Sequence, residues 1–461
     1  MTKPAKRFYP PFPSRLPPVA ALVRTLWQGD GDLLSLLPAE AYVMKAGQLG
    51  YSRRSIKLVN DAELIRQVML DEDEIFPKSD LMVGALEKLI GNSIFVSDGA
   101  IWRRQRAMID PAFSMMRLSL AFTAMEGAVA DYLERLTAAA SEETPFSLDL
   151  AMSHLTADII CRTVFSISLQ SNIAKDVFDD FAMFERNVGQ VKIGRLIMDP
   201  AFAKVRQAED VLAACARIRS HLGALVDTHL KDDGGCYNDI ASQVIAARDA
   251  ESGEPFSREE LIDQLGVFFM AGHETTASAL TWAFYILAMR PDIMEALRSE
   301  VYDVVGDGPI TFDAVRKLPL TRSIFRETLR LYPPITFMPR VAMRSGMLGD
   351  MRFRRGALIM IAPWIVHRHR DFWPEADAFD PYRFMPEREA DVVPGTYIPF
   401  GLGPHTCIGA GFAQAEGALI LGSVARRFDA FIKNGEAVRP AARLTTRPRN
   451  EIMMTVRARQ T

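Results

Sequence analysis

Apolar residues recur every three to four positions along most of this chain, and this feature constrains its fold more than any other. Such spacing is typical of α-helices with one buried face. The longest segments that show it are residues 116–138, 150–168, 206–231, 258–290, 292–305 and 408–428. Runs with strand character are short, namely YVMKAG (42–47), SIKLV (55–59) and GALIMIA (356–362), with a hairpin turn expected at YSRR (51–54). The chain is therefore predicted to be mainly α, with a small β portion.

The number of domains follows from the continuity of this pattern. A length of 461 residues would by itself suggest two or three domains. No repeat with a period of 20–50 residues and no low-complexity linker interrupts the helical segments. We therefore predict one domain over residues 46–461. A Pro-rich segment and an entry helix, without a membrane anchor, are expected over residues 1–45.

Composition excludes several classes of partner. Apolar residues make up 49% of the chain, charged residues make up 24%, and the formal net charge is −3, so global electrostatics gives no reason to expect nucleic acid as a partner. The four cysteines form no C-x-x-C pair, which argues against a zinc ribbon and a disulfide framework. The longest apolar runs, 266–272 and 356–366, are too short to span a bilayer. We expect a soluble protein of the reducing cytoplasm.

The N-terminal segment has an unusual composition. Its first 20 residues include six prolines, and five basic residues but no acidic one precede Asp30. Basic stretches of this kind are attracted to an anionic membrane surface. Because no apolar anchor accompanies these residues, we expect membrane contact to be weak or none.

One loop carries the most specific chemical pattern in the chain. Residues 399–411 read PFGLGPHTCIGAG and lead directly into a helical segment. The pattern within the loop is F-x-x-G-x-H-x-C-x-G, formed by Phe400, Gly403, His405, Cys407 and Gly409. Five fixed positions seldom coincide by chance. At these residues the chain resembles the haem-binding loop of the cytochrome P450 monooxygenases, in which the position two before the cysteine is Arg or His.

The resemblance implies that Cys407 is the axial ligand of the iron in haem b. A thiolate ligand donates electron density to the iron and favours cleavage of the O–O bond. The helix that follows would place its N-terminal dipole near the sulfur, and glycines such as Gly409 would let the backbone approach the porphyrin. For Cys161, Cys215 and Cys236 we expect the ordinary role of buried core thiols.

A second resemblance lies in the longest apolar segment, which contains AGHETT. The distal helix of the P450 family carries A/G-G-x-D/E-T-T/S at its centre. By this likeness, Ala271 and Gly272 would leave room for dioxygen, and Glu274 and Thr275 would deliver protons to it. A carboxylate among apolar neighbours is costly to bury unless it is paired or hydrated. His273 is expected to be an ordinary helix histidine with satisfied hydrogen bonds.

The family's E-x-x-R motif has a candidate at Glu327 and Arg330. The same spacing also begins at Glu63 and at Glu295, so the spacing alone does not select a pair. The sequence LRLYPP that follows Glu327 singles out the pair Glu327–Arg330, because it ends the helix as the family's motif does. With Arg383 in the stretch PYRF, these residues would form a buried charge network that holds the cysteine loop in place.

Cationic residues are expected around the haem propionates. Trp102 and Arg106 resemble the family's W-x-x-x-R, whose i,i+4 spacing places both side chains on one helix face. His405 and Arg340 occupy positions that commonly reach propionates in the family. Phe400 completes the residues expected to contact the cofactor, as the first position of the cysteine pattern.

The resemblance also implies an activity and a source of electrons. The protein would insert one oxygen atom from O2 into an apolar organic substrate, by hydroxylation or epoxidation. No segment remains for a fused reductase domain, so electrons would come from a separate ferredoxin and an NAD(P)H-dependent flavin reductase. Arg103 and Arg104 are expected on a solvated helix face, where a ferredoxin with an acidic surface would be able to dock.

The substrate is constrained only weakly. Expected pocket walls at residues 79–91, 193–200, 267–271 and 333–339 are apolar and rich in methionine, which suits a fatty acid or a terpenoid. Two other functions stay open. One is a peroxide-driven hydroxylase or lipid-hydroperoxide isomerase, which the acid–alcohol pair disfavours because such enzymes need no external protons. The other is a non-catalytic haem sensor, for which an output domain is expected.

Overall fold

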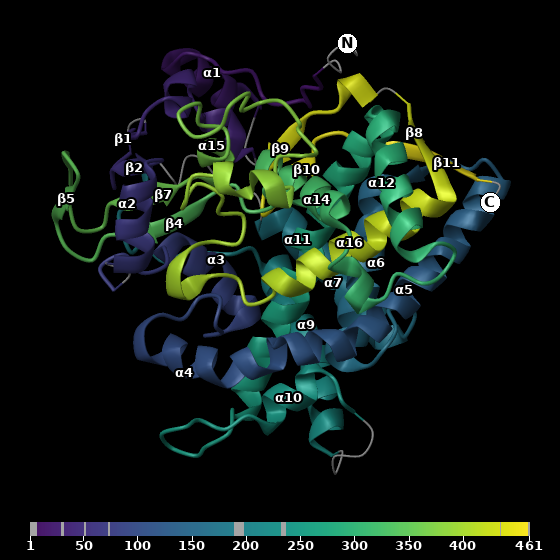
Figure 1. Ribbon diagram of the computed structural model, residues 1–461. Coiled ribbons are helices and arrows are strands. Elements are labelled where there is room, and N and C mark those ends of the chain that lie inside the picture. Colours follow the sequence, from purple (N-terminus) through teal and green to yellow (C-terminus); the bar gives the residue numbers. More distant parts are fainter. Residues whose placement is uncertain are drawn as a thin grey trace.

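The computed structural model describes residues 7–28, 32–49, 52–71, 74–188, 198–231, 237–433 and 435–459. In this part of the chain most residues are helical (Figure 1). The helix α11 passes through the middle of the molecule, and the sheet that contains β1, β2, β4 and β7 lies at one edge. The fold is one α-rich domain with a small β lobe, as the sequence predicts.

The described helices have the following bounds: α1 Pro18–Gln28, α2 Ala62–Arg66, α3 Asp80–Ile90, α4 Gly99–Ile109, α5 Met115–Ser141, α6 Leu148–Phe165, α7 Asn172–Val188, α9 Glu209–Leu230, α10 Ile240–Ala246, α11 Arg258–Met289, α12 Pro291–Val305, α13 Phe312–Val315, α14 Pro319–Leu331, α15 Pro363–Val366 and α16 Ala410–Arg427. The six helical segments predicted from apolar spacing are confirmed as α5, α6, α9, α11, α12 and α16. Among the described helices, none combines the length and apolarity that a bilayer span requires.

The described strands are β1 Ala46–Gln48, β2 Ile56–Val59, β3 Phe146–Ser147, β4 Met338–Val341, β5 Gly346–Leu348, β6 Met351–Phe353, β7 Leu358–Ile361, β8 Phe428–Ile432, β9 Pro440–Ala442, β10 Thr446–Pro448 and β11 Met453–Ala458. The main sheet has the order β1-β2-β7-β4, in which β2 and β7 are parallel and the other pairs are antiparallel. A second sheet has the order β3-β11-β8, while β9 pairs with β10 and β5 with β6.

The helix α11 is apolar on all sides because it is the core of the domain. Ser257 caps its N-terminus in a capping box with Glu260, which satisfies two otherwise unpaired backbone N–H groups. From Leu261 to Leu287 nearly every side chain is buried, against α6, α9, α14 and α16. A helix without a solvent face is expected at the centre of a large domain. Any polar residue along it therefore requires a specific partner.

One predicted strand is wrong over most of its length. Residues 52–54 of the expected hairpin lie between β1 and β2, which pair antiparallel, and Tyr51 lies outside the described residues. Of the run 42–47, however, only the last two residues belong to β1, whereas Tyr42 ends a short 3-10 turn and is buried. The Tyr42 hydroxyl accepts a hydrogen bond from the Trp364 indole at 3.0 Å, and the Arg15 guanidinium lies 4.3 Å from its ring. Tertiary contacts at this tyrosine outweigh its strand propensity.

The N-terminal arm packs on the segment before the cysteine loop. Phe8 forms a β-bridge with Phe379, and Arg15 pairs with Asp377 at 2.6 Å. A further ion pair joins Arg7 to Glu375 at 3.0 Å, with both side chains largely exposed. These basic residues therefore have acidic partners within the protein.

Candidate functional site

The cysteine loop is shaped by two glycines with left-handed backbone conformations. Gly401 has φ +82° and Gly403 has φ +75°, and a Cβ on Gly403 would come within 2.5 Å of the Met69 carbonyl oxygen. Only glycine adopts such a conformation at little cost in so close a contact. The turn lets the Cys407 N–H donate a hydrogen bond to the Phe400 carbonyl at 2.8 Å. This hydrogen bond joins the first residue of the pattern F-x-x-G-x-H-x-C to its last.

The thiol of Cys407 lies at the entrance of α16. Gly409 is the residue before this helix, and its backbone N–H lowers the pKa of the Cys407 thiol, as does the cation of Arg106. The larger influence is the removal of the sulfur from bulk water by the surrounding protein, which raises this pKa even though part of the residue is exposed. Cys407 is a free and exposed cysteine, whereas the free cysteines Cys161 and Cys215 are buried. Cys236 lies outside the described residues.

Basic side chains converge beside this loop. The rings of His405 and Trp102 are 3.9 Å apart, and Arg106 Nη1 donates to the Thr406 carbonyl at 2.7 Å. Burial and the cations Lys78, Arg340 and Arg106 lower the pKa of His405 to about 3. His405 is therefore a neutral imidazole within a cationic cluster.

Lys78 is a member of this cluster that the sequence did not predict. Its ammonium donates to the carbonyls of Ile94 and Ser97 at 3.0 and 2.5 Å, and its side chain is buried. Burial lowers the pKa of Lys78 to about 7. The charge of Asp98 opposes this shift, and nearby Arg340 adds to it. A lone lysine in the sequence FPKSD carries no signal of this position, because its neighbours in space come from other segments.

This set of groups fits a dianionic prosthetic group bound next to a thiol. Buried cations repel one another and are stabilised when a ligand brings carboxylates to them. A haem carries two propionates and an iron that accepts a thiolate. The donor set around Cys407 and His405 therefore matches haem in charge and in ligand chemistry.

The distal turn of α11 is connected to the cysteine side by aromatic contacts. The Phe113 ring lies 5.2 Å from Phe268 of α11 and 6.4 Å from Phe412 of α16. Thr275, seven residues after Phe268, donates its hydroxyl to the Ala271 carbonyl at 2.7 Å. Such a bond within one helix turn competes with the backbone ladder and loosens it locally.

Gly272 lies where two helices approach each other closely. A Cβ on Gly272 would lie 2.3 Å from Cδ1 of Ile160 in α6. The missing side chain therefore allows α6 and α11 to pack closely, and the role of Gly272 in making room for dioxygen stays a prediction. Ala271 is half-buried on the same turn.

Glu274 has partners that lie far away in the sequence. Arg447 of β10 pairs with its carboxylate through Nε at 3.0 Å and through Nη2, and the Thr445 hydroxyl donates to Oε1 at 2.5 Å. Burial favours the neutral acid, but the Arg447 guanidinium outweighs it and holds the pKa of Glu274 below its usual range. Arg447 Nη1 also donates to Asp149 of α6 at 2.7 Å. The predicted acid–alcohol pair is thus part of a larger ion network.

His273 was expected to be a satisfied helix histidine. Its Nδ1 lies 2.8 Å from the Phe269 carbonyl oxygen, which fits that expectation. Its Nε2, however, faces Glu185 of α7 at 3.4 Å. Glu185 is a second, partly buried acid beside Glu274 that the sequence did not single out.

The E-x-x-R residues lie together in the core. Glu327 and Arg330 are fully buried and form two hydrogen bonds of 2.7 and 2.8 Å, and Arg383 Nε lies 3.3 Å from the same carboxylate. Arg330 Nη1 also donates to the carbonyls of His367 and Ala376, both at 2.7 Å. Every charge in this group has a charged or polar partner.

His367 links this network to the cysteine loop. Its Nδ1 lies 3.1 Å from the Arg330 carbonyl oxygen, and its Nε2 accepts a hydrogen bond from the Ile398 N–H at 2.9 Å, directly before the loop. Burial and the cations Arg330 and Arg368 lower its pKa to about 3, which keeps the ring neutral and able to accept. Nothing in the sequence around His367 predicted this bridge.

The two arginines expected on a solvated face differ. Arg103 is exposed and lies 3.4 Å from Glu74. Arg104 instead pairs with Glu260 at 2.6 Å and donates to the Pro255 carbonyl, and its side chain is 27% exposed. The capping box of α11 brings Glu260 to this position.

The expected pocket walls are described in part. Residues 79–91 form α3, which packs against α11, and 267–271 lie in α11 itself. Residues 333–339 run from the end of α14 into β4. Within 193–200, residues 193–197 lie outside the described residues.

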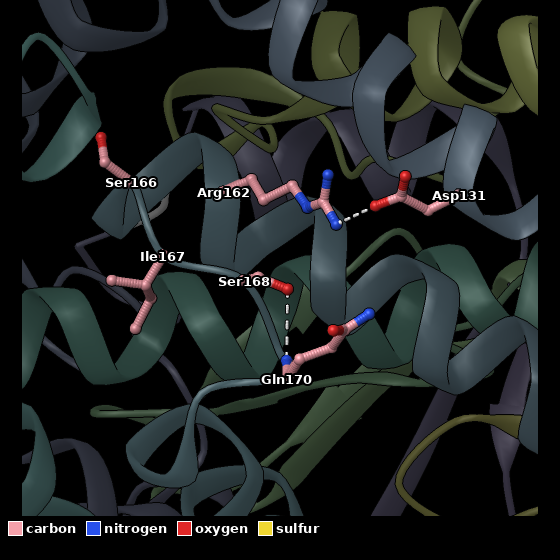
Figure 2. A pocket seen from close by; sticks show the side chains of 6 residues that line it. All are labelled: Asp131, Arg162, Ser166, Ile167, Ser168 and Gln170. Atoms are coloured by element: carbon pink, nitrogen blue, oxygen red, sulfur yellow. Dashed lines mark hydrogen bonds and ion pairs between the residues drawn. The ribbon is translucent and has the colours of Figure 1, made fainter.

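A polar surface pocket of about 480 Å³ lies elsewhere, at the end of α6 (Figure 2). It is lined by Asp131, Arg162, Ser166, Ile167, Ser168 and Gln170. Arg162 pairs with Asp131 at 2.5 Å, and the Ser168 hydroxyl accepts from the Gln170 N–H. None of the predicted site residues lines it, so this pocket is not the site described above.

The cationic cluster, the thiol and the buried acid–alcohol turn define a class of protein that holds an anionic redox cofactor. The family described as Cytochrome P450 matches residues 47–456. The chain belongs to the cytochrome P450 family, and it is an oxidoreductase of the monooxygenase type.

Named relatives agree with this assignment, and a solved structure shares the fold. The chain is 30% identical over 427 residues to "Cyclooctatin synthase" of Streptomyces melanosporofaciens, covering 92% of this chain and 89% of the relative. It is also 30% identical to "Cyclooctat-9-en-7-ol 5-monooxygenase" of the same organism, over 89% of this chain and 87% of the relative. The crystal structure of a cytochrome P450 (CYP102L1) superposes with a TM-score of 0.81 over 99% of this chain and 100% of that chain, at 21% identity, and shows the fold alone.

Proposed function

We propose that this protein is a haem b monooxygenase that hydroxylates or epoxidises a cyclic terpenoid. The observation that carries the proposal is the juxtaposition of Cys407 with the cationic cluster. Cys407 would ligate the iron, and Arg106, Arg340, His405, Trp102 and Lys78 would hold the propionates and the rim of the macrocycle. Phe400 and Gly409 would shape the loop around the sulfur.

The bound haem supplies oxygen activation, for which a thiolate ligand is suited. The protein has three tasks around it. The fully satisfied network of Glu327, Arg330 and Arg383 fixes the loop, so the thiol does not have to be ordered when the cofactor binds. Thr275 presents a hydroxyl on the distal turn, and Glu274 holds charge behind it. The apolar walls formed by α3 and α11 exclude water from the substrate.

The carbon monoxide spectrum of the reduced protein tests the cofactor assignment. We expect the red-shifted Soret band of a thiolate-ligated haem, and its loss in Cys407→Ala. Cys161→Ala is the matched control, because it removes a thiol that is buried away from the loop. A red-shifted band that persists in Cys407→Ala would contradict the assignment.

The terpenoid class is supported by the two relatives, one of which is named for the oxidation of cyclooctat-9-en-7-ol. Spin-state titration of the ferric protein with cyclic terpene alcohols and with straight-chain fatty acids of similar carbon number tests this class. We expect the cyclic compounds to shift the haem to high spin at lower concentration. A stronger response to the fatty acids would favour a chain hydroxylase instead.

We also propose a ferredoxin and a flavin-dependent NAD(P)H reductase as electron donors, in the reducing cytoplasm. The free state of the described cysteines is consistent with that compartment. Arg103 is the better candidate for docking, because its side chain is 58% exposed, whereas that of Arg104 is 27% exposed and pairs with Glu260. Arg103→Glu should weaken ferredoxin binding several-fold in low salt. Unchanged affinity and salt dependence would remove Arg103 from the interface.

A further inference from the structure

Three side chains of two helices meet behind the distal turn. Glu185, in the last turn of α7, brings a carboxylate oxygen close to His273 and Glu274 of α11. One potential ligand atom from each of the three lies within 4.8 Å of the others. His273 and Glu274 are buried, and the Glu185 side chain is 16% exposed. Two acids and an imidazole at this spacing must share protons or a cation.

The tautomer of His273 follows from its hydrogen bonds. The Phe269 carbonyl at Nδ1 only accepts, so Nδ1 carries the hydrogen. In the neutral ring Nε2 is then an acceptor, and it faces Glu185 Oε1 at 3.4 Å. Among the described residues, this oxygen is buried and has no hydrogen-bond donor. Two acceptors face each other here, and a proton between them would resolve the conflict.

The charges around the cluster indicate which group holds that proton. Burial lowers the pKa of His273, although the charge of Glu274 opposes it, so the ring stays neutral. Glu274 is ionised through Arg447. Burial raises the pKa of Glu185 well above its usual range, and the Glu274 charge raises it further. Arg447 lowers this pKa, whereas a side-chain hydrogen bond with Glu274 and the charge of Asp149 raise it.

We propose that Glu185 is a neutral carboxylic acid that shares its proton with Glu274 and His273 and serves as the proton-holding residue behind the distal turn. It acts through Glu274, so it is a positioning residue rather than a catalytic one. The Glu185 O–H bond breaks as its proton passes to the ionised Glu274 carboxylate, and Glu274 then releases this proton to the distal pocket and becomes an anion again. The Glu185 carboxylate, whose side chain is 16% exposed, then takes up a proton from hydronium or buffer acid of the bulk solvent.

A divalent cation is the competing occupant of the same three groups. Arg447 already contacts both carboxylate oxygens of Glu274 and brings a positive charge to the site. This charge repels a metal ion but leaves a proton free to move between the two acids. The geometry therefore favours the shared proton.

Infrared spectroscopy of the holoenzyme tests the protonation state without any substrate. With ¹³C-labelled glutamate, wild-type protein at neutral pH should show an isotope-sensitive carboxylic acid C=O band that Glu185→Gln lacks. Asp176→Asn, an exposed acid on the same helix, is the matched control and should retain the band. An unchanged spectrum in Glu185→Gln would overturn the proposal. So would zinc or manganese that binds the dialysed holoenzyme with one-to-one stoichiometry and is lost in this variant.

Turnover supplies a second readout. With a surrogate ferredoxin pair and any compound that gives the high-spin shift, Glu185→Gln should lower the ratio of product to NAD(P)H about tenfold. Its pH profile should be flatter, and Glu185→Asp should recover part of the ratio. The carbon monoxide spectrum checks that the variants retain folded, thiolate-ligated haem. A normal ratio and a normal pH profile in Glu185→Gln would exclude the role.

Discussion

Two buried carboxylate–arginine pairs in this protein use the same chemistry for different functions. Glu327 and Arg330 lie three residues apart on α14, and both are fully buried. Glu274 and Arg447 come from α11 and β10, and this pair continues to Asp149, whose side chain is 36% exposed. The first pair is closed off from water, whereas the second has one end near solvent.

The surroundings of the two carboxylates sharpen the contrast. Around Glu327 every partner is a donor, namely Arg330, Arg383 and the Asp380 N–H. Around Glu274 the donors Arg447 and Thr445 are joined by the acid Glu185. A carboxylate surrounded by donors is held ionised, whereas one beside a second acid is able to exchange a proton. We infer that the first pair fixes the cysteine loop and the second handles protons.

Breaking the Glu327–Arg330 pair, which is closed off from water, should have the largest effect on stability. Arg330→Met leaves the Glu327 charge buried without its main partner, which costs about 3–5 kcal/mol of unfolding free energy. Denaturant unfolding of the holoenzyme measures this loss, and haem should also be released more readily. Arg66→Met, in the exposed Glu63–Arg66 pair, is the control with the same spacing. A loss below about 1 kcal/mol, the range of surface pairs, would contradict the assigned role.

Breaking the Glu274–Arg447 pair, which has one end near solvent, should lower the unfolding free energy by less, and this loss should depend on pH. Arg447→Met should lower the unfolding free energy by about 1–3 kcal/mol near neutral pH, because Glu274 is able to take up a proton instead. The pKa of Glu274 is depressed in the folded protein, so this pair stabilises above the ordinary glutamate pKa and the contribution is lost as pH falls through the folded value.

A double-mutant cycle with Glu274→Gln isolates the coupling between the two side chains, for which we expect about 0.5–3 kcal/mol. The difference between wild type and Arg447→Met should shrink toward acid pH. A cost that equals that of Arg330→Met and stays constant with pH would remove the distinction between the two pairs.

Glu185 should give a pH dependence of the opposite sign. Its pKa is raised in the folded protein, so its contribution to stability is full below the ordinary glutamate pKa and declines as pH rises through the folded value. Glu185→Gln does not ionise, so its stability relative to wild type should improve between about pH 5 and pH 8. Denaturation midpoints across this range measure the trend. A difference that does not vary with pH would show that Glu185 is ionised in the folded protein.

The smallest effect on stability is expected at Asp149, the exposed partner of Arg447. Asp149→Asn should change the unfolding free energy by less than about 1 kcal/mol, because its pair with Arg447 is partly in water. The change should become smaller still in high salt. Thermal unfolding at two ionic strengths measures this change. A loss comparable to that of Arg447→Met would mean that the Asp149–Arg447 pair is not screened by water.

Local patterns in the sequence predicted a large share of this structure. Apolar spacing located α5, α6, α9, α11, α12 and α16, because a buried helix face repeats every three to four residues. The pattern around Cys407 and the pair Glu327–Arg330 were also found, since their parts lie within a few residues of one another. In each case the residues that interact, or the backbone turn that they form, are neighbours in the chain.

Tertiary structure alone decided the partners of the buried charges. Arg447 and Glu185 reach Glu274 from β10 and α7, Lys78 reaches the cysteine side from the segment before α3, and His367 joins Arg330 to the loop. The sequence established that a carboxylate inside α11 needs a partner, because an unpaired buried charge is too costly. It could not say which side chain supplies that partner, because dozens of arginines and acids have the right chemistry and only the packing of distant elements brings one of them within 3 Å.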